Sequence, residues 1–144
     1  MNTSKISLII HFILGIISIV FGLKYLFSTE FLPYHREAIQ MDWTELDSNL
    51  QTILLGFMRA TAGGLLCSGV LVIVLQYRFY KQKLCWLPVP ILLAGLITSL
   101  GAVYATALVK FNTTASPPFL LSVLVVLVYI LGYFTNKRSI NENN

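Results

Sequence analysis

Four long apolar stretches constrain this chain more than any other feature of its sequence. They cover residues 6–27, 53–75, 86–109 and 117–135, the last one beginning at Pro117 because proline fits the first turn of a helix. At about 1.5 Å per residue, such stretches span roughly the 30 Å of a bilayer's hydrocarbon core. The runs are continuous rather than alternating, so they predict helices and not barrel strands. We expect residues 1–144 to form a single transmembrane domain, an all-α integral membrane four-helix bundle.

The composition agrees with a membrane protein. Apolar residues make up 56% of the chain and charged residues only 11%, which leaves no room for a separate soluble domain. The first stretch is too long for a secretory signal and lacks a small-residue cleavage pattern, so we expect it to be retained as an anchor. The net charge is +4, but the basic residues are scattered through turns and tails. Nucleic acid is therefore not an expected partner.

The distribution of lysine and arginine predicts the orientation, because basic short loops stay in the cytoplasm. One side of the predicted membrane carries Lys5, Arg78, Lys81, Lys83, Lys137 and Arg138, and the other carries Lys24, Arg36 and Lys110. Both termini are therefore predicted to be cytoplasmic. Residues 28–52 then form a long extracytoplasmic loop between the first two spans.

The two cysteines fit this topology without a disulfide. Cys67 lies about 12 Å above the inner end of the second span, whereas Cys85 lies at the inner start of the third. That offset exceeds the reach of a disulfide. We expect Cys67 to be a buried small apolar residue.

Small residues recur at helical spacing in the second and third spans. The two strips consist of Gly56, Ala60, Gly63, Gly64 and Ser68 in one and Ala94, Thr98, Ala102 and Thr106 in the other. Small side chains let helices approach closely in lipid, so these two spans are predicted to form the core of the bundle. A second copy of the chain is the alternative partner for one of the strips.

The long loop carries five of the six acidic residues, and loops of such length are often functional. Asp42 followed by Glu45 resembles a helix-start capping pair. The second helix is therefore predicted to begin near Asp42 and to project above the membrane.

Arg59 is the one formal charge deep inside a predicted span. Such a charge normally faces a protein interior or a wet cavity with a partner. Together with residues at similar depth and in the loop above, it can enclose a ligand-binding pocket whose members are Arg59, Tyr104, Thr106, Tyr34, His35 and Glu37. Two interpretations remain open: the guanidinium binds an anionic, lipid-like ligand, or it ties the loop to the bundle through a carboxylate.

The two histidines lie on opposite sides of the predicted membrane, which excludes a bis-histidine haem. His11 is expected to be an interior residue with its hydrogen bonds satisfied. His35 and Glu37 offer ligand atoms for zinc, but their spacing matches no recognised zinc signature, and no metal or other cofactor is predicted. Nucleophilic-triad, phosphate-loop and dinucleotide motifs are absent.

The second span contains Arg59-Ala60-x-x-Gly63-Gly64 and continues to Gly69, within a chain of four short spans. In this respect the chain resembles the DoxX-like group and related small four-helix bacterial membrane proteins. The resemblance implies the bacterial inner membrane and an accessory role in a membrane oxidoreductase assembly. The Pro33-Tyr34-His35-Arg36 segment of the loop has no counterpart in that group.

These features favour a non-enzymatic membrane protein that binds a hydrophobic or anionic lipid-like ligand or acts as an accessory subunit of a membrane complex. Its expected partners are membrane lipids, with a membrane protein or a second copy of the chain as further possibilities. The alternative is a membrane-embedded enzyme with an extracytoplasmic site around His35 and Arg59, with or without a metal. A transporter comes third, because no broken helix crosses the midplane.

Overall fold

The computed structural model describes residues 3–142, which form five α-helices and one short 3-10 helix. The α-helices are α1 (Thr3–Phe27), α2 (Pro33–Ile39), α3 (Ser48–Gln82), α4 (Pro88–Asn112) and α5 (Phe119–Asn141), and the 3-10 helix η1 (Trp43–Glu45) lies between α2 and α3. The helices α1, α3, α4 and α5 are long and apolar enough to cross a membrane. The all-helical class is confirmed, as are four helices long and apolar enough to span a membrane, and α2 is a fifth helix that was not predicted.

The start of α3 differs from the prediction. The helix begins at Ser48, where the Asp47 side chain accepts a hydrogen bond of 2.8 Å from the backbone N–H of Asn49. Asp42 and Glu45, which suggested an earlier start, do form the predicted capping contact: the Asp42 N–H donates to Glu45 Oε2 at 2.9 Å. It caps η1 instead of the long helix, because the local turn satisfies the capping signal by itself.

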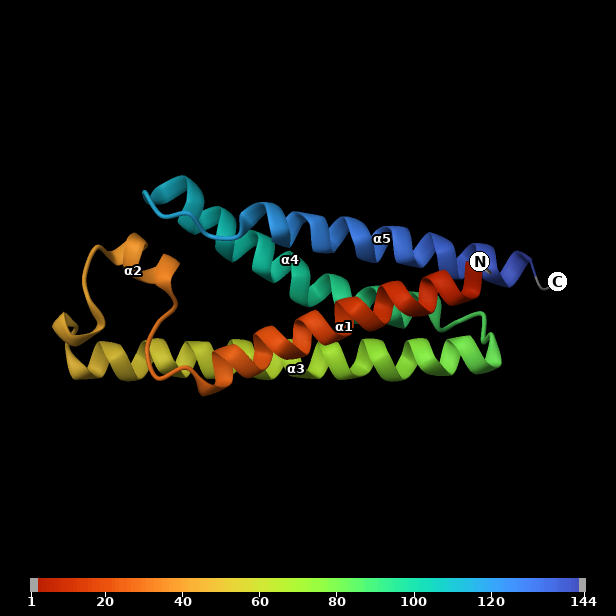
Figure 1. Cartoon of the computed structure of the whole chain (residues 1–144), viewed down its shortest axis with the longest axis horizontal. Coiled ribbons are helices and arrows are strands. Elements are labelled where there is room, and N and C mark those ends of the chain that lie inside the picture. Colours follow the sequence, from red (N-terminus) through yellow and green to blue (C-terminus); the bar gives the residue numbers. More distant parts are fainter. Residues whose placement is uncertain (1–2, 143–144) are drawn as a thin grey trace.

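The long helices form two pairs, α1 with α3 and α4 with α5, and the contacts within each pair are the most extensive in the molecule. Figure 1 shows both termini and the α3–α4 turn at one end, which we call the termini end. At the other end, which we call the cap end, the two pairs diverge and α2 lies between them. The cap itself comprises residues 28–47.

The spans are apolar on the outside, and their interior combines large apolar side chains such as Phe79 and Ile91 with small and polar ones. Large side chains such as Ile97 (73% exposed) face outward, whereas the buried set includes Ser7, His11, Gln76 and Asn136. Glycine permits the closest helix approach: a Cβ on Gly15 would lie 2.5 Å from Ile73 Cγ1. This arrangement is expected in lipid, where small residues let helices pack and polar groups must turn inward.

The predicted pairing of the second and third spans through their small-residue strips is wrong for most of the α3 strip. Ser68 is buried and donates to Ala94 O at 2.7 Å, but a Cβ on Gly56, Gly63 or Gly64 would have no neighbour within 4 Å. The reason is that α1 packs against a different face of α3, where a Cβ on Gly69 would lie 2.7 Å from Gly15 O.

Part of the α4 strip also contacts a helix other than the predicted one. Thr106 is buried, but its hydroxyl lies 3.1 Å from Ser122 Oγ, on α5 rather than on α3. Within the α4 strip, Ala94 thus contacts α3 as predicted, whereas Thr106 contacts α5.

Both cysteines are free thiols, as predicted. Cys67 is exposed, so the expectation that it is buried was wrong. It lies on the same side of α3 as Gly63, four residues away, and this side faces away from α1.

Candidate functional site

Arg59 clamps the end of α1 to α3. Its Nη1 donates to Tyr25 O and its Nη2 to Ser28 O, both at 2.6 Å. These carbonyls belong to the C-terminal turn of α1 and the residue after it, where the helix leaves unpaired acceptors and a partial negative charge. The side chain is half-buried, and its partner is backbone rather than the carboxylate of the structural interpretation.

The cap is shaped by local hydrogen bonds. Pro33 stands in the first turn of α2, and the backbone N–H of Leu32 donates to His35 Nδ1 at 3.2 Å. Gln40 ends α2 in the left-handed region, at φ 58°. Gln51 of α3 then holds the last part of the cap, since its Nε2 donates to Trp43 O at 2.7 Å. The chain therefore folds back on itself twice within twenty residues.

A small apolar core fastens the cap to the helices below it. Phe31, Leu32 and Leu46 of the cap are buried together with Met58 of α3. The Phe31 and Trp43 rings meet edge to face with their centroids 5.1 Å apart, a favourable aromatic geometry. Since this core includes α3, the cap is fixed to the α1–α3 pair.

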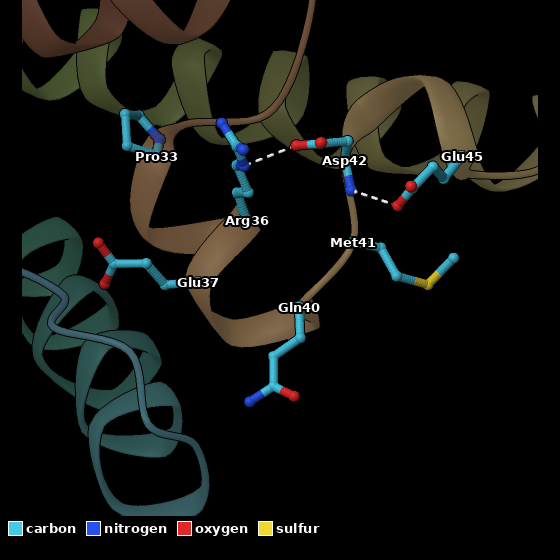
Figure 2. A pocket seen from close by; sticks show the side chains of 7 residues that line it. All are labelled: Pro33, Arg36, Glu37, Gln40, Met41, Asp42 and Glu45. Atoms are coloured by element: carbon cyan, nitrogen blue, oxygen red, sulfur yellow. Dashed lines mark hydrogen bonds and ion pairs between the residues drawn. The ribbon is translucent and has the colours of Figure 1, made fainter.

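Two polar contacts extend the cap to the other helix pair. The backbone N–H of Ser116, in the α4–α5 connection, donates to Glu37 Oε2 at 3.0 Å. Gln40 Nε2 donates to Thr114 Oγ1 at 3.4 Å. Figure 2 shows Glu37 pointing toward this connection. The cap thus bridges the diverging pairs, and both bridging contacts are exposed.

The cap lines a polar pocket of about 570 Å³ that is open to its surroundings. Its lining consists of Pro33, Arg36, Glu37, Gln40, Met41, Asp42 and Glu45 (Figure 2). Arg36 Nε pairs with Asp42 Oδ1 at 2.6 Å across one side. Both side chains are more than half exposed, so this ion pair contributes little stability, at most about 1 kcal/mol.

Burial shifts the titration of two cap residues. It lowers the pKa of the His35 imidazole from its ordinary value. It raises the pKa of the Tyr34 hydroxyl, with a further contribution from the hydrogen bond of 2.5 Å to the Tyr25 hydroxyl. Both groups are therefore held in their neutral forms at pH 7.

The six predicted pocket residues are divided among three helices, α2, α3 and α4. Tyr34, His35 and Glu37 share α2, and Arg59 lies beneath the cap at the end of α1. Tyr104 is 68% exposed on the outside of α4, and Thr106 is buried between α4 and α5. The structure therefore brings together Tyr34 and Arg59, which both contact Tyr25, but not the two α4 residues.

Metal binding finds no support in the described residues. Within residues 3–142, no group of three His, Cys, Asp or Glu side chains lies close enough to hold a metal ion. His35 uses its Nδ1 to accept from Leu32, which orients the ring within the cap.

A buried polar network at the termini end was missed by the sequence analysis. Asn136 Nδ2 donates to Gln76 Oε1 at 2.9 Å, Gln76 Nε2 donates back to Asn136 Oδ1 at 3.1 Å, and Ser7 Oγ donates to the same Oδ1 at 2.5 Å. All three side chains are fully buried. The predicted spans stopped at residues 75 and 135 because polar residues follow, and this choice excluded both amides. Gln76 gave the clearer signal, as a single amide between Leu75 and Tyr77, whereas Asn136 lies between Thr135 and Lys137.

His11 belongs to this network, as its Nδ1 lies 2.8 Å from Ser7 O. Its Nε2 has no hydrogen-bond partner in the described chain. The prediction that both ring nitrogens of His11 are hydrogen-bonded is therefore correct for Nδ1 only. The ring packs directly on Gly132, where a Cβ would lie 2.7 Å from Nε2. This contact joins α1 to α5.

The facing surfaces of α3 and α4 separate beyond the contact of Ser68 with Ala94. Toward the cap, helical spacing continues the α3 surface through Gly64, Thr61 and Phe57, and the α4 surface through Thr98, Gly101 and Ala105. A Cβ on Gly64 or Gly101 would have no neighbour within 4 Å, and Phe57 is 68% exposed. We call the open surface that these six residues form on the two helices the wedge. It is apolar and hydroxyl-bearing, and Figure 1 shows the two helix pairs diverging along it toward the cap end.

No family model matches the chain, and neither a curated protein nor a solved structure matches it.

Proposed function

We propose that this protein is a non-enzymatic integral membrane protein that binds the acyl chains of a lipid-like ligand in the wedge, beneath the cap. The observation that carries the proposal is the open space beside Gly64 and Gly101 on two facing helices. Within a bilayer such a space takes up hydrocarbon, because leaving it empty forfeits dispersion contacts on both walls.

The walls suit an acyl chain better than a charged molecule. The six wedge residues carry no formal charge, and the polar atoms among their side chains are the two threonine hydroxyls. The Thr61 hydroxyl is already engaged, since it donates to Phe57 O at 2.9 Å. Charge is concentrated instead in the cap, at the end of the wedge where a lipid headgroup would lie.

In this proposal Arg59 has a structural role. Two of its N–H groups bind carbonyls at the end of α1, which fixes the base of the cap. The guanidinium then sets the cap above the wedge instead of holding an anion by itself.

The setting we propose is the bacterial cytoplasmic membrane, with both termini in the cytoplasm and the cap outside. The positive-inside distribution supports the orientation, and the resemblance to DoxX-like proteins supports the setting and an accessory role in a membrane complex.

Paired glycine substitutions test the wedge. In the double variant Gly64→Leu/Gly101→Leu, two isobutyl groups enter the wedge. The matched control is Gly56→Leu/Gly63→Leu, where the added groups also meet open space but point away from α4. The measurement is binding of a pyrene-labelled phosphatidylcholine to each purified variant in detergent.

The wedge variant should bind this probe about tenfold more weakly than wild type, since losing the burial of two methylenes costs roughly 1.6 kcal/mol. The control should bind like wild type. Unchanged binding in the wedge variant would contradict the proposal, as would an equal loss in both variants.

A further inference from the structure

The charges of the molecule are divided unequally between its two ends. The termini end carries Lys5, Arg78, Lys81, Lys83, Lys137 and Arg138, with Glu142 as its acid. The cap end carries four basic residues against five acidic ones. The net positive charge of +4 therefore lies entirely at the termini end, because the cap end is slightly acidic.

Most of these cations lack a carboxylate partner. Arg138 pairs with Glu142 at 2.8 Å, whereas Arg78 contacts the neutral Gln82 and Lys81 lies over the Tyr77 ring. Lys83 turns inward and donates to Ser139 Oγ at 2.7 Å.

Lys5 and Lys137 are the most available of the cations. Both are exposed, and within residues 3–142 neither makes an ion pair, a side-chain hydrogen bond or a ring contact. They extend from the first turns of α1 and the last turns of α5, which lie at the same end of the molecule (Figure 1).

Exposed aromatic side chains place this end at a membrane–water interface. Trp86 is 61% exposed and Tyr77 is 51% exposed, and such rings prefer the headgroup level. The neighbouring lysines can therefore reach lipid phosphates while their methylene stems remain in the apolar region.

We propose that the termini end is a binding surface for anionic phospholipid headgroups, with Lys5 and Lys137 as its principal contacts. The partner is identified by charge complementarity: several cations free of carboxylates lie at headgroup depth, where the available anions are lipid phosphates. This surface is separate from the wedge, because it lies at the opposite end of the spans and binds the charged headgroup instead of the acyl chains.

The test uses short-chain phosphatidylglycerol and phosphatidylcholine of equal acyl length, titrated into the purified full chain in detergent. Wild type should bind phosphatidylglycerol more tightly. Each lysine near an anionic group contributes roughly a fivefold factor, so Lys5→Gln/Lys137→Gln should reduce the preference roughly 25-fold. The preference should also fall with added salt.

Two further variants keep the result interpretable. Lys24→Gln/Lys110→Gln removes two exposed cations at the cap end and should keep the preference. Lys5→Arg/Lys137→Arg keeps the charge and should also keep it, which separates charge from misfolding.

An unchanged preference in Lys5→Gln/Lys137→Gln would overturn the proposal, and so would a loss in the cap-end variant alone. Absence of any preference in wild type would overturn it as well and would leave an acidic protein segment as the partner to test. The wedge proposal would be unaffected, since its own test compares acyl-chain binding with one neutral headgroup.

Discussion

At the termini end, buried side chains hydrogen-bond across α1, α3 and α5, whereas at the cap end the two helix pairs diverge and are bridged by two exposed contacts from the cap. The first arrangement fixes the helices, because in lipid the buried amides find no other partner. The second leaves the pairs free to adapt to what lies between them. The proposed ligand site thus lies in the half with the fewer contacts between the two helix pairs.

Two glycines on α4 give the largest expected contrast between a packed helix surface and the wedge. A Cβ on Gly95 would lie 2.2 Å from the Tyr129 ring, whereas one on Gly101 would meet nothing within 4 Å. Gly95→Val should therefore destabilise the fold by about 3 kcal/mol or more, and Gly101→Val by less than about 0.5 kcal/mol. Unfolding in mixed detergent micelles measures both. Equal losses would mean that the wedge is closed in the folded protein.

Removing one amide from the buried network should have the next largest effect. Asn136→Leu leaves Ser7 and Gln76 without their shared partner, which should cost about 2 kcal/mol. Thr61→Val in the wedge is the control and should change stability by less than about 0.5 kcal/mol, because its hydroxyl bonds only within its own helix. A loss from Thr61→Val as large as that from Asn136→Leu would remove the distinction between the halves.

Loss of the Arg59 clamp should have a moderate effect. Arg59→Met frees the carbonyls of Tyr25 and Ser28, and we expect a loss of about 1–2 kcal/mol that is the same in delipidated detergent and after adding lipid. Thermal unfolding under both conditions checks this. Destabilisation confined to the lipid-containing sample would instead assign Arg59 a ligand-binding role.

The pH dependence of the cap should be the smallest effect. Burial lowers the pKa of His35 in the folded state, so the unfolded chain binds more protons as the pH falls below about 6.5. The contribution of His35 is therefore complete above that pH and is lost progressively toward the folded-state pKa. Protonation at Nδ1 also removes the acceptor for the Leu32 N–H.

Melting temperatures between pH 8 and pH 5 measure this contribution. Wild type should show a small decline on acidification that His35→Asn, which keeps a neutral acceptor, does not show. His11 is present in both proteins and cancels. Parallel curves would mean that the cap does not sense the protonation of His35.

The sequence predicted the spans well because hydrophobic length is a property of the chain alone. It predicted less of the packing. The glycines at positions 56, 63 and 64 have the spacing of a contact strip, yet α1 packs against Gly69, and nothing in the periodicity of α3 distinguishes the two faces. The face that a neighbour occupies depends on the other helices.

The candidate site was likewise predictable only where its residues are close in sequence. Tyr34, His35 and Glu37 share a short helix, so their proximity follows from local sequence. Tyr104 and Thr106 were grouped with Arg59 by depth alone, and depth does not fix the rotation of a helix about its axis. The pairing of Gln76 with Asn136 could not be predicted, because the two residues lie 60 positions apart in sequence.

A distance between spin labels on Phe57 and Ala105, measured in lipid nanodiscs, tests most directly whether the two halves differ. Both positions are exposed, and they lie on facing walls of the wedge. Our account predicts a separation well beyond that of helices in direct contact, whose axes lie about 8–10 Å apart. A single narrow distance that matches directly packed helices would contradict it.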